Sequence, residues 1–321
     1  MHKQSKGRLG LLWLGLAACF ASLPAHAQPG RPLHLVVITA PGGAADQTAR
    51  LIGDQLGKVL DRPVLVENKP GAGGNIASQY VARAEPNGDT LLLTSNNHTI
   101  NTALYRQPGY STGDFVPVVQ LARGPSVTVV PPDSKYKTIK QLIEDARSSP
   151  VSFGSIGVGS GAHIVAECLK ATTGAQFEHI PYKGGAPAVA DVVGGHVPVV
   201  FTTLASAGVY VHSGKLRGLS VSSEKRSETV PDVPTLEESG YGACTYATWL
   251  GIVGPKGMPA DVVDRLNQAI ARIVHMDKVK ETILTLGYEP VGDTPDQFGE
   301  MLSADMEKTS KLIRQAGITA D

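Results

Sequence analysis

The chain contains three glycine-rich turns, each of which follows a strand-like apolar run and opens a helical pattern. A helix N-terminus presents free backbone N–H groups whose dipole favours an anion, and glycine lets a ligand approach the backbone closely. A plain tight turn between a strand and a helix is the structural alternative, but three such turns in one chain favour an anion-binding site. The turns are Pro41-Gly42-Gly43-Ala44-Ala45-Asp46, the segment from Gly154 to His163, and Pro181-Tyr182-Lys183-Gly184-Gly185.

The second turn also matches part of a dinucleotide-binding pattern. Gly157, Gly159 and Ala162 have the G-x-G-x-x-A spacing, which requires an acidic residue at the end of the following strand. Glu178 has the right spacing, but it precedes the expected strand segment. We therefore do not expect a nicotinamide cofactor.

Neither a catalytic nucleophile nor a metal site is evident. No serine lies in a G-x-S-x-G turn, and Ser160 and His163 are merely neighbours on one helical turn. His163 and Glu167 share a helix face, but no second pair of ligands supports them. Asp46 is expected to cap the first helix, with Arg50 as its partner on the helix face. We expect no enzyme activity, no cofactor and no metal.

Composition and periodicity indicate an α/β protein. Of 321 residues, 42% are hydrophobic and 18% charged, with 29 cations balancing 29 anions, which excludes a disordered chain and gives no reason to bind nucleic acid. Short apolar runs alternate with helical patterns, which favours largely parallel sheets. Thr138 and Thr294 each precede a glutamine by three residues, as in a capping box. Long strands near 116–130 and 244–253 are expected to cross between two lobes.

The N-terminal segment predicts a secretory signal peptide. Three basic residues lie among the first eight, an apolar run spans 9–23, and a small-x-small site ends at Ala27. Cleavage before Gln28 would export the protein and leave a small net negative charge. The apolar run is short for a membrane anchor, which needs about 20 residues. Lipid modification of Cys19 is the alternative form of export.

Two cysteines follow the signal segment, Cys168 and Cys244. An oxidising compartment permits a disulfide between them. Because the sequence does not show whether they approach each other, both a disulfide and two buried thiols remain open, and we favour the thiols.

The motifs, in this order, resemble those of the Bug receptors, the extracytoplasmic solute-binding proteins of tripartite tricarboxylate transporters. The resemblance covers about residues 33–317. It rests on the three turns, Val66 to Gly74, Pro231-Asp232-Val233-Pro234-Thr235, Trp249, and Gly254-Pro255 before Pro259.

This resemblance implies a two-lobed periplasmic-binding-protein fold of the Venus-flytrap, type II-like kind, with a mixed sheet in each lobe. We expect residues 28–124 and 247–321 in the first lobe and 125–246 in the second. The implied role is a periplasmic, monomeric receptor that captures a small carboxylated solute in an interlobe cleft and delivers it to the membrane subunits of a transporter. A sensor for a membrane signalling partner and an exported hydrolase are the alternatives.

Family members contact the solute largely through backbone amides and bridging waters. Carried over by motif, the ligand contacts would come from five short segments. They are Gly42, Gly43, Ala44 and Ala45; Ser95, Asn96 and Asn97; Ser155, Gly159, Ser160 and His163; Tyr182, Lys183 and Gly184; and Thr202 with Thr203. The chain departs from the family at Ala45, where many members have a hydroxyl, and at Thr202, where Asp or Asn is common.

Overall fold

The computed structural model describes residues 30–182 and 184–316, so the predicted signal segment and Lys183 lie outside the described residues. Strands and helices alternate along most of this part of the chain, as the sequence predicts. The strands are β1 (Leu33–Val37), β2 (Val64–Asn68), β3 (Thr90–Ser95), β4 (Phe115–Val130), β5 (Val151–Ser155), β6 (Phe177–Pro181), β7 (Val199–Thr203), β8 (Arg217–Val221), β9 (Ala247–Pro255) and β10 (Glu289–Pro290). The α-helices are α1 (Ala44–Leu60), α2 (Asn75–Ala82), α3 (Asn97–Leu104), α4 (Ile139–Ser148), α5 (Gly161–Thr173), α6 (Gly185–Val193), α7 (Leu204–His212), α8 (Ala260–Val274), α9 (Asp277–Thr285) and α10 (Pro295–Ala316), and three short 3-10 turns are η1 (Ala72–Gly74), η2 (Thr112–Asp114) and η3 (Gly242–Cys244).

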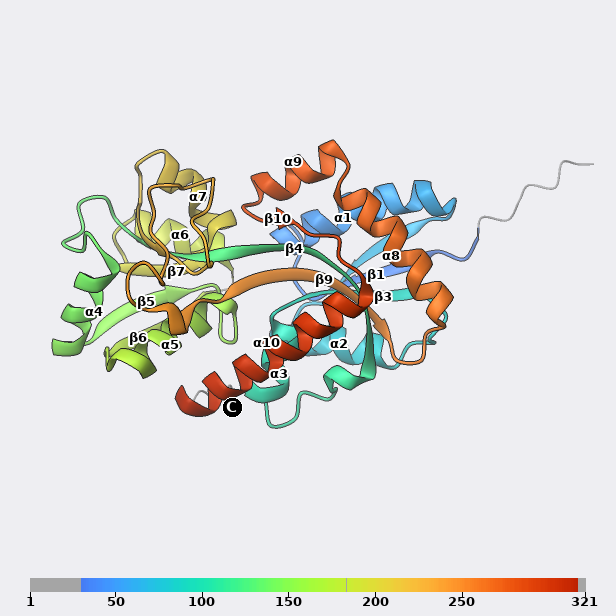
Figure 1. The fold of residues 1–321 in the computed structure, drawn as a ribbon, viewed down its shortest axis with the longest axis horizontal. Helices are drawn as coiled ribbons and strands as arrows, with labels where there is room; N and C mark the ends of the chain where they lie inside the picture. The colour runs from blue at the N-terminus through green and yellow to red at the C-terminus, as the bar shows by residue number, and fades with distance from the viewer. Residues whose placement is uncertain (1–29, 183, 317–321) are drawn as a thin grey trace, which may run out of the picture.

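The strands form a mixed, two-lobed sheet (Figure 1). In the first lobe the order is β2-β1-β3-β9-β4, and in the second it is β4-β7-β5-β6, with β8 also on β4. The neighbours of β1 and of β5 are parallel to them, whereas β4 and β9 pair antiparallel with theirs. Figure 1 shows β4 and β9 running side by side between the lobes. The exact boundaries of the lobes stay a prediction.

Local sequence explains where several helices begin. Thr138 accepts a hydrogen bond from the N–H of Gln141 at 3.2 Å and so caps α4. At α10 the box is reciprocal: the Thr294 N–H donates to the Gln297 side chain at 3.0 Å, and the Gln297 N–H donates to the Thr294 hydroxyl at 3.3 Å. These predicted caps are confirmed. The expected strands at 116–121 and 126–130 are one continuous strand, β4, whose only exposed residue is Arg123.

The last helix connects the two lobes. Phe298 of α10 is fully buried and packs edge-on against Trp249, 5.7 Å between ring centroids, in the core of the first lobe. Near its other end, Leu312 and Ile313 belong to the core of the second lobe. Figure 1 shows α10 running diagonally below β4 and β9, beside α3. We expected the C-terminal helices to return to the first lobe, which holds for α8 but not for all of α10.

Cys168 and Cys244 form a disulfide, so our prediction of two buried thiols is wrong. Their Cα atoms are 5.5 Å apart, within the range that a disulfide spans. Cys168 lies on α5 and Cys244 ends η3, just before β9. The bond therefore ties the start of a crossing strand to a helix of the second lobe. Among the described residues, no helix has the length and apolar character needed to cross a membrane.

Candidate functional site

The predicted ligand residues lie where parallel strands end. In α/β sheets ligands bind outside the carboxyl ends of the strands. Ser95, the last residue of β3, pairs with Leu250 of β9, which in turn pairs with Ala122 of β4. Thr203, the last residue of β7, pairs with Ser126 of the same β4. The carboxyl edges of the two lobes thus face each other, separated along β4 by about 13 Å at the usual rise per residue.

The first turn begins α1 with glycine, not with the aspartate cap that we expected. Gly43, with φ −78°, is the N-cap, and its carbonyl accepts the N–H of Gln47 at 3.0 Å. The amides of Gly43, Ala44 and Ala45 precede this first helical bond, so the helix itself provides them with no acceptor. Gly42 has the left-handed φ of +91°. Its N–H donates at 2.9 Å to Asp46, which lies inside the first turn of the helix.

The Asn96 side chain holds the beginning of β9 in place. Its Oδ1 accepts the Trp249 N–H at 3.0 Å, and its Nδ2 donates to the Ala247 carbonyl and to the Tyr246 hydroxyl, both at 3.1 Å. Asn96 is only 3% exposed. Any ligand contact from this residue would therefore use its main chain. Beside it, the Ser95 hydroxyl donates to Asn97 Oδ1 at 3.2 Å.

A buried polar network lies behind this edge, and no sequence pattern predicted it. The Asp305 carboxylate of α10 accepts hydrogen bonds from the Thr99 hydroxyl and, at 3.4 Å, from Trp249 Nε1. Burial raises the pKa of Asp305, although the Thr99 hydrogen bond opposes the rise. The Tyr246 hydroxyl lies 3.2 Å from that of Thr309. These residues are distant in sequence, so only the fold brings them together.

The second turn is held by its own side chains. Ser160 is the N-cap of α5: its hydroxyl accepts the His163 N–H at 3.2 Å and donates to the Gly157 carbonyl at 2.7 Å. The hydroxyl is therefore bonded to main chain and is not paired with the imidazole, as a nucleophile would be. Gly159 lies against α3 of the first lobe, since a Cβ there would come within 2.8 Å of the Leu104 side chain. This turn consequently contacts both lobes.

Two neutral histidines back the second turn. His163 Nδ1 accepts the Gly159 N–H at 3.3 Å, and its ring stacks on that of His179 with centroids 4.1 Å apart. His179 Nε2 lies 2.6 Å from the buried Ser155 hydroxyl. Burial lowers the pKa of His163 to about 3 and that of His179 to about 4. Both rings are uncharged near neutral pH, and the described part of the chain contains no cluster of residues that could hold a metal ion.

The third turn adjoins the second. The Tyr182 N–H donates to the Ser155 carbonyl at 3.0 Å, and its hydroxyl donates to Asp191 at 2.7 Å. Burial and this bond raise the pKa of Tyr182 to about 12. Gly184, with φ +128°, is the N-cap of α6. Thr202 Oγ1 is buried and has no hydrogen-bond partner in residues 30–182 and 184–316.

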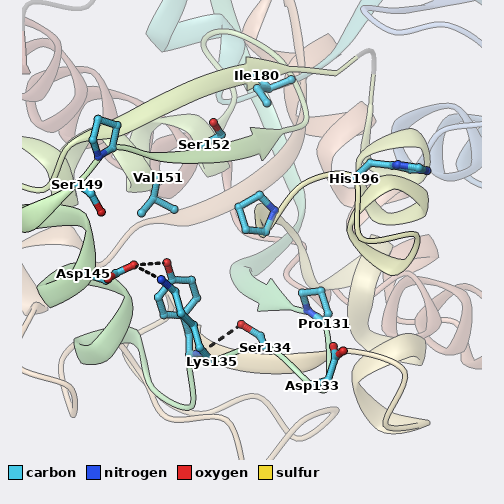
Figure 2. Close-up of a pocket in the computed structure, with 13 residues that line it drawn as sticks. Pro131, Asp133, Ser134, Lys135, Asp145, Ser149, Val151, Ser152, Ile180 and His196 are labelled. Atoms are coloured by element: carbon cyan, nitrogen blue, oxygen red, sulfur yellow. Dashed lines mark hydrogen bonds and ion pairs between the residues drawn. The ribbon is translucent and has the colours of Figure 1, made fainter.

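Two surface hollows lie away from these turns. One of about 580 Å³ sits near the amino ends of β5 and β7, opposite the edge that bears the turns (Figure 2). On its wall Asp145 binds Lys135 at 2.7 Å and accepts the Tyr136 hydroxyl at 2.6 Å. A second hollow of about 530 Å³ adjoins the start of β8. No predicted ligand residue lines either hollow.

Comparison with known proteins assigns the chain to a family. The model of the tripartite tricarboxylate transporter family receptor matches residues 48–318. BugT of Bordetella pertussis is 32% identical over 95% of each chain. The structure of R. palustris Rpa4515 with adipate has a TM-score of 0.83 and 30% identity, covering 91% of this chain and 99% of that one. MatC of Rhodopseudomonas palustris with bound malate has a TM-score of 0.80 and 26% identity, covering 89% and 99%. The chain therefore belongs to the tripartite tricarboxylate transporter receptor family, to which the Bug proteins belong, and is a periplasmic solute-binding receptor rather than an enzyme.

Proposed function

We propose that this receptor captures a small carboxylate between its lobes and delivers it to the membrane subunits of a tripartite tricarboxylate-type transporter. The observation that carries the proposal is the meeting of two carboxyl edges about 13 Å apart along β4, each with glycine-rich helix openings. Amides at such openings favour an anion. Adipate in Rpa4515 and malate in MatC are carboxylates bound by relatives.

In this proposal backbone amides provide most of the charge stabilisation. The turns at Gly43–Ala45, Ser155–Ser160 and Tyr182–Gly184 face the solute, and Ser95–Asn97 with Thr202–Thr203 complete the site. Asn96 takes part through its main chain, because its side chain is bonded to β9. The unpartnered hydroxyl of Thr202 suits a bridging water or a solute oxygen.

Calorimetry against a panel of mono- and dicarboxylates, including adipate and malate, tests the proposal. At least one acid should bind, and its neutral amide should bind far more weakly. A solute at 100 times its Kd should also raise the unfolding free energy by about 2.7 kcal/mol. Equal affinity for an acid and its amide would contradict binding through anion-directed amides.

Export is the second part of the proposal. We infer cleavage after Ala27, within the segment outside the described residues, so that the exported protein begins at Gln28. Intact-mass measurement of the periplasmic protein tests this directly. A lipid-modified Cys19 at the N-terminus would show a membrane-tethered receptor instead.

A further inference from the structure

We propose that Asp46, Arg50 and Asn68 are positioning residues of the ligand site, holding the first turn in the shape in which the amides of Gly43–Ala45 can receive a solute. The inference rests on the proposed function for its purpose, but its structural basis is independent of any ligand. We call these three residues the Asp46 clamp.

The carboxylate of Asp46 is fully occupied by donors from its own chain. It accepts the Gly42 N–H at 2.9 Å, Arg50 Nε at 3.1 Å, Arg50 Nη2 at 2.9 Å and Asn68 Nδ2 at 2.9 Å. Its side chain is only 4% exposed. A carboxylate with this many donors has no need of a ligand partner, which favours a supporting role over direct solute contact.

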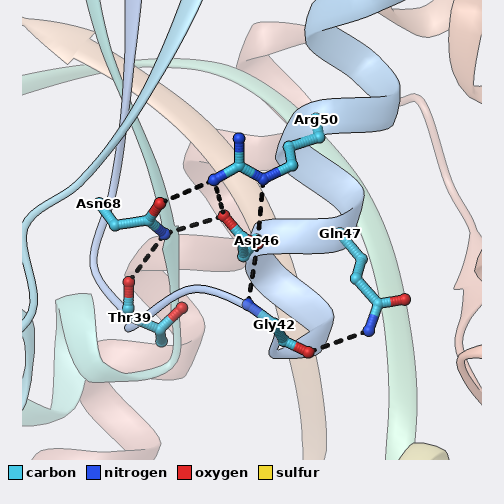
Figure 3. A network of polar contacts seen from close by, with 6 residues as sticks. All are labelled: Thr39, Gly42, Asp46, Gln47, Arg50 and Asn68. Atoms are coloured by element: carbon cyan, nitrogen blue, oxygen red, sulfur yellow. Dashed lines mark hydrogen bonds and ion pairs between the residues drawn. The ribbon is translucent and has the colours of Figure 1, made fainter.

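Asn68 closes the clamp into a ring. Its Nδ2 also donates to the Thr39 carbonyl at 3.0 Å, and its Oδ1 accepts Arg50 Nη2 at 3.0 Å (Figure 3). Asn68 is the last residue of β2, Thr39 follows β1, and Arg50 is on α1. The ring thus joins the ends of two parallel strands to the helix that the first turn opens.

The clamp holds Gly42, whose backbone conformation is unfavourable for other residues. Gly42 has a φ of +91°, a conformation that costs other residues about 1–2 kcal/mol. Its N–H is bound by Asp46, and its carbonyl accepts Gln47 Nε2 at 3.0 Å. With both sides of this residue held, the next three amides are presented in a fixed direction. Pre-organisation of this kind raises affinity because the turn need not be ordered on binding.

The clamp also pairs the charges of Asp46 and Arg50 with each other, so that neither is left to bind the solute. Arg50 and Asp46 neutralise each other at 2.9 Å, and the Nε and Nη2 of Arg50 are already donating. Burial alone would raise the pKa of Asp46, but hydrogen bonds from Arg50, Gly42 and Asn68 outweigh it and lower the pKa. Asp46 therefore stays ionised at neutral pH without repelling an incoming carboxylate as strongly as a lone anion would.

The test compares hydrogen–deuterium exchange of the full mature protein and its variants across the peptide that covers 39–46. Asp46→Asn removes the charge from the ring and should speed exchange of this peptide at least tenfold. Asp54→Asn is the matched control, since Asp54 and Lys58 form an exposed i,i+4 ion pair on the same helix at 2.7 Å. The control should leave exchange of the peptide unchanged.

Asn68→Ala is the second variant. It removes the donor to Asp46 and to the Thr39 carbonyl as well as the acceptor of Arg50 Nη2, so it too should speed exchange of the peptide. Adipate binding is measured alongside, and Asp46→Asn should weaken it at least tenfold while far-UV circular dichroism shows that the variant is still folded. Unchanged exchange in Asp46→Asn or in Asn68→Ala would overturn the clamp. If adipate and the other carboxylates fail to bind wild type, the proposed function fails while the exchange result still decides the clamp.

Discussion

His98 should make the stability of the first lobe sensitive to mild acid. The ring is 1% exposed, lies edge-on to Phe115 with centroids 4.7 Å apart and stacks on Tyr110 at 5.7 Å. Its Nδ1 has no hydrogen-bond partner among the described residues. Burial therefore lowers the pKa of His98 to about 4. An imidazolium in this aromatic setting would be a buried charge without an anion.

The sign of the effect follows from linkage. A histidine with a lowered pKa in the folded state binds its proton only after unfolding, so its contribution to stability is complete above pH 6.5 and is lost as the pH falls toward 4. Between pH 7 and pH 5, a shift from 6.5 to about 4 corresponds to a loss of about 2 kcal/mol in the unfolding free energy. His163, 3% exposed, should contribute a similar loss.

Urea denaturation at pH 7 and pH 5 measures this difference. His98→Leu, of similar volume, should reduce the pH-dependent loss by about 2 kcal/mol, because the variant has no ring to protonate. His212 is exposed, so His212→Asn should retain the full dependence and serves as the control. A His98→Leu protein that loses as much stability as wild type between these pH values would show that the ring is not the source.

Three further predictions concern the backbone and the disulfide. Replacing both Cys168 and Cys244 with alanine should lower the unfolding free energy by about 2–4 kcal/mol and abolish the response of unfolding to reductant. Gly42→Ala should cost about 1–2 kcal/mol in urea denaturation because of its positive φ, whereas Gly43→Ala, at φ −78° with nothing near its Cβ, should unfold like wild type but bind carboxylates more weakly. Gly159→Ala should destabilise by about 1–3 kcal/mol, since its Cβ would overlap a leucine of α3 and its φ is +74°; an unfolding curve like that of wild type would contradict the contact between the lobes.

Features that depend on local sequence were predictable. The caps at Thr138 and Thr294 each require only a hydroxyl and a glutamine three residues on. Both hydroxyls cap their helices, although only the box at Thr294 is reciprocal, because Gln141 accepts the N–H of Lys137 instead of that of Thr138. The composition of the glycine-rich turns likewise predicts where helices begin. The resemblance to the Bug receptors then supplied the two-lobed arrangement, which local patterns alone only suggested.

Features that depend on residues far apart in the sequence were not predictable. The Cys168–Cys244 bond closes a separation of 76 residues, and no local signal shows that η3 returns to α5. Asp46 was expected to cap α1 because aspartate is common at that position. Instead, its carboxylate accepts a hydrogen bond from Asn68 of a neighbouring strand and belongs to the clamp. In each case tertiary contacts outweighed a local preference.

The electrostatics of the site follow from the way its charges are already paired. Asp46 and Arg50 bind each other, and burial keeps His163 and His179 neutral. In the proposed site, a solute carboxylate at these described residues would therefore meet mainly backbone dipoles. Dipoles fixed by the fold stabilise an anion without the desolvation of a counter-charge, and their direction is set by the strand ends. In the proposed site the Asp46 clamp therefore contributes to recognition, because it determines where those amides point.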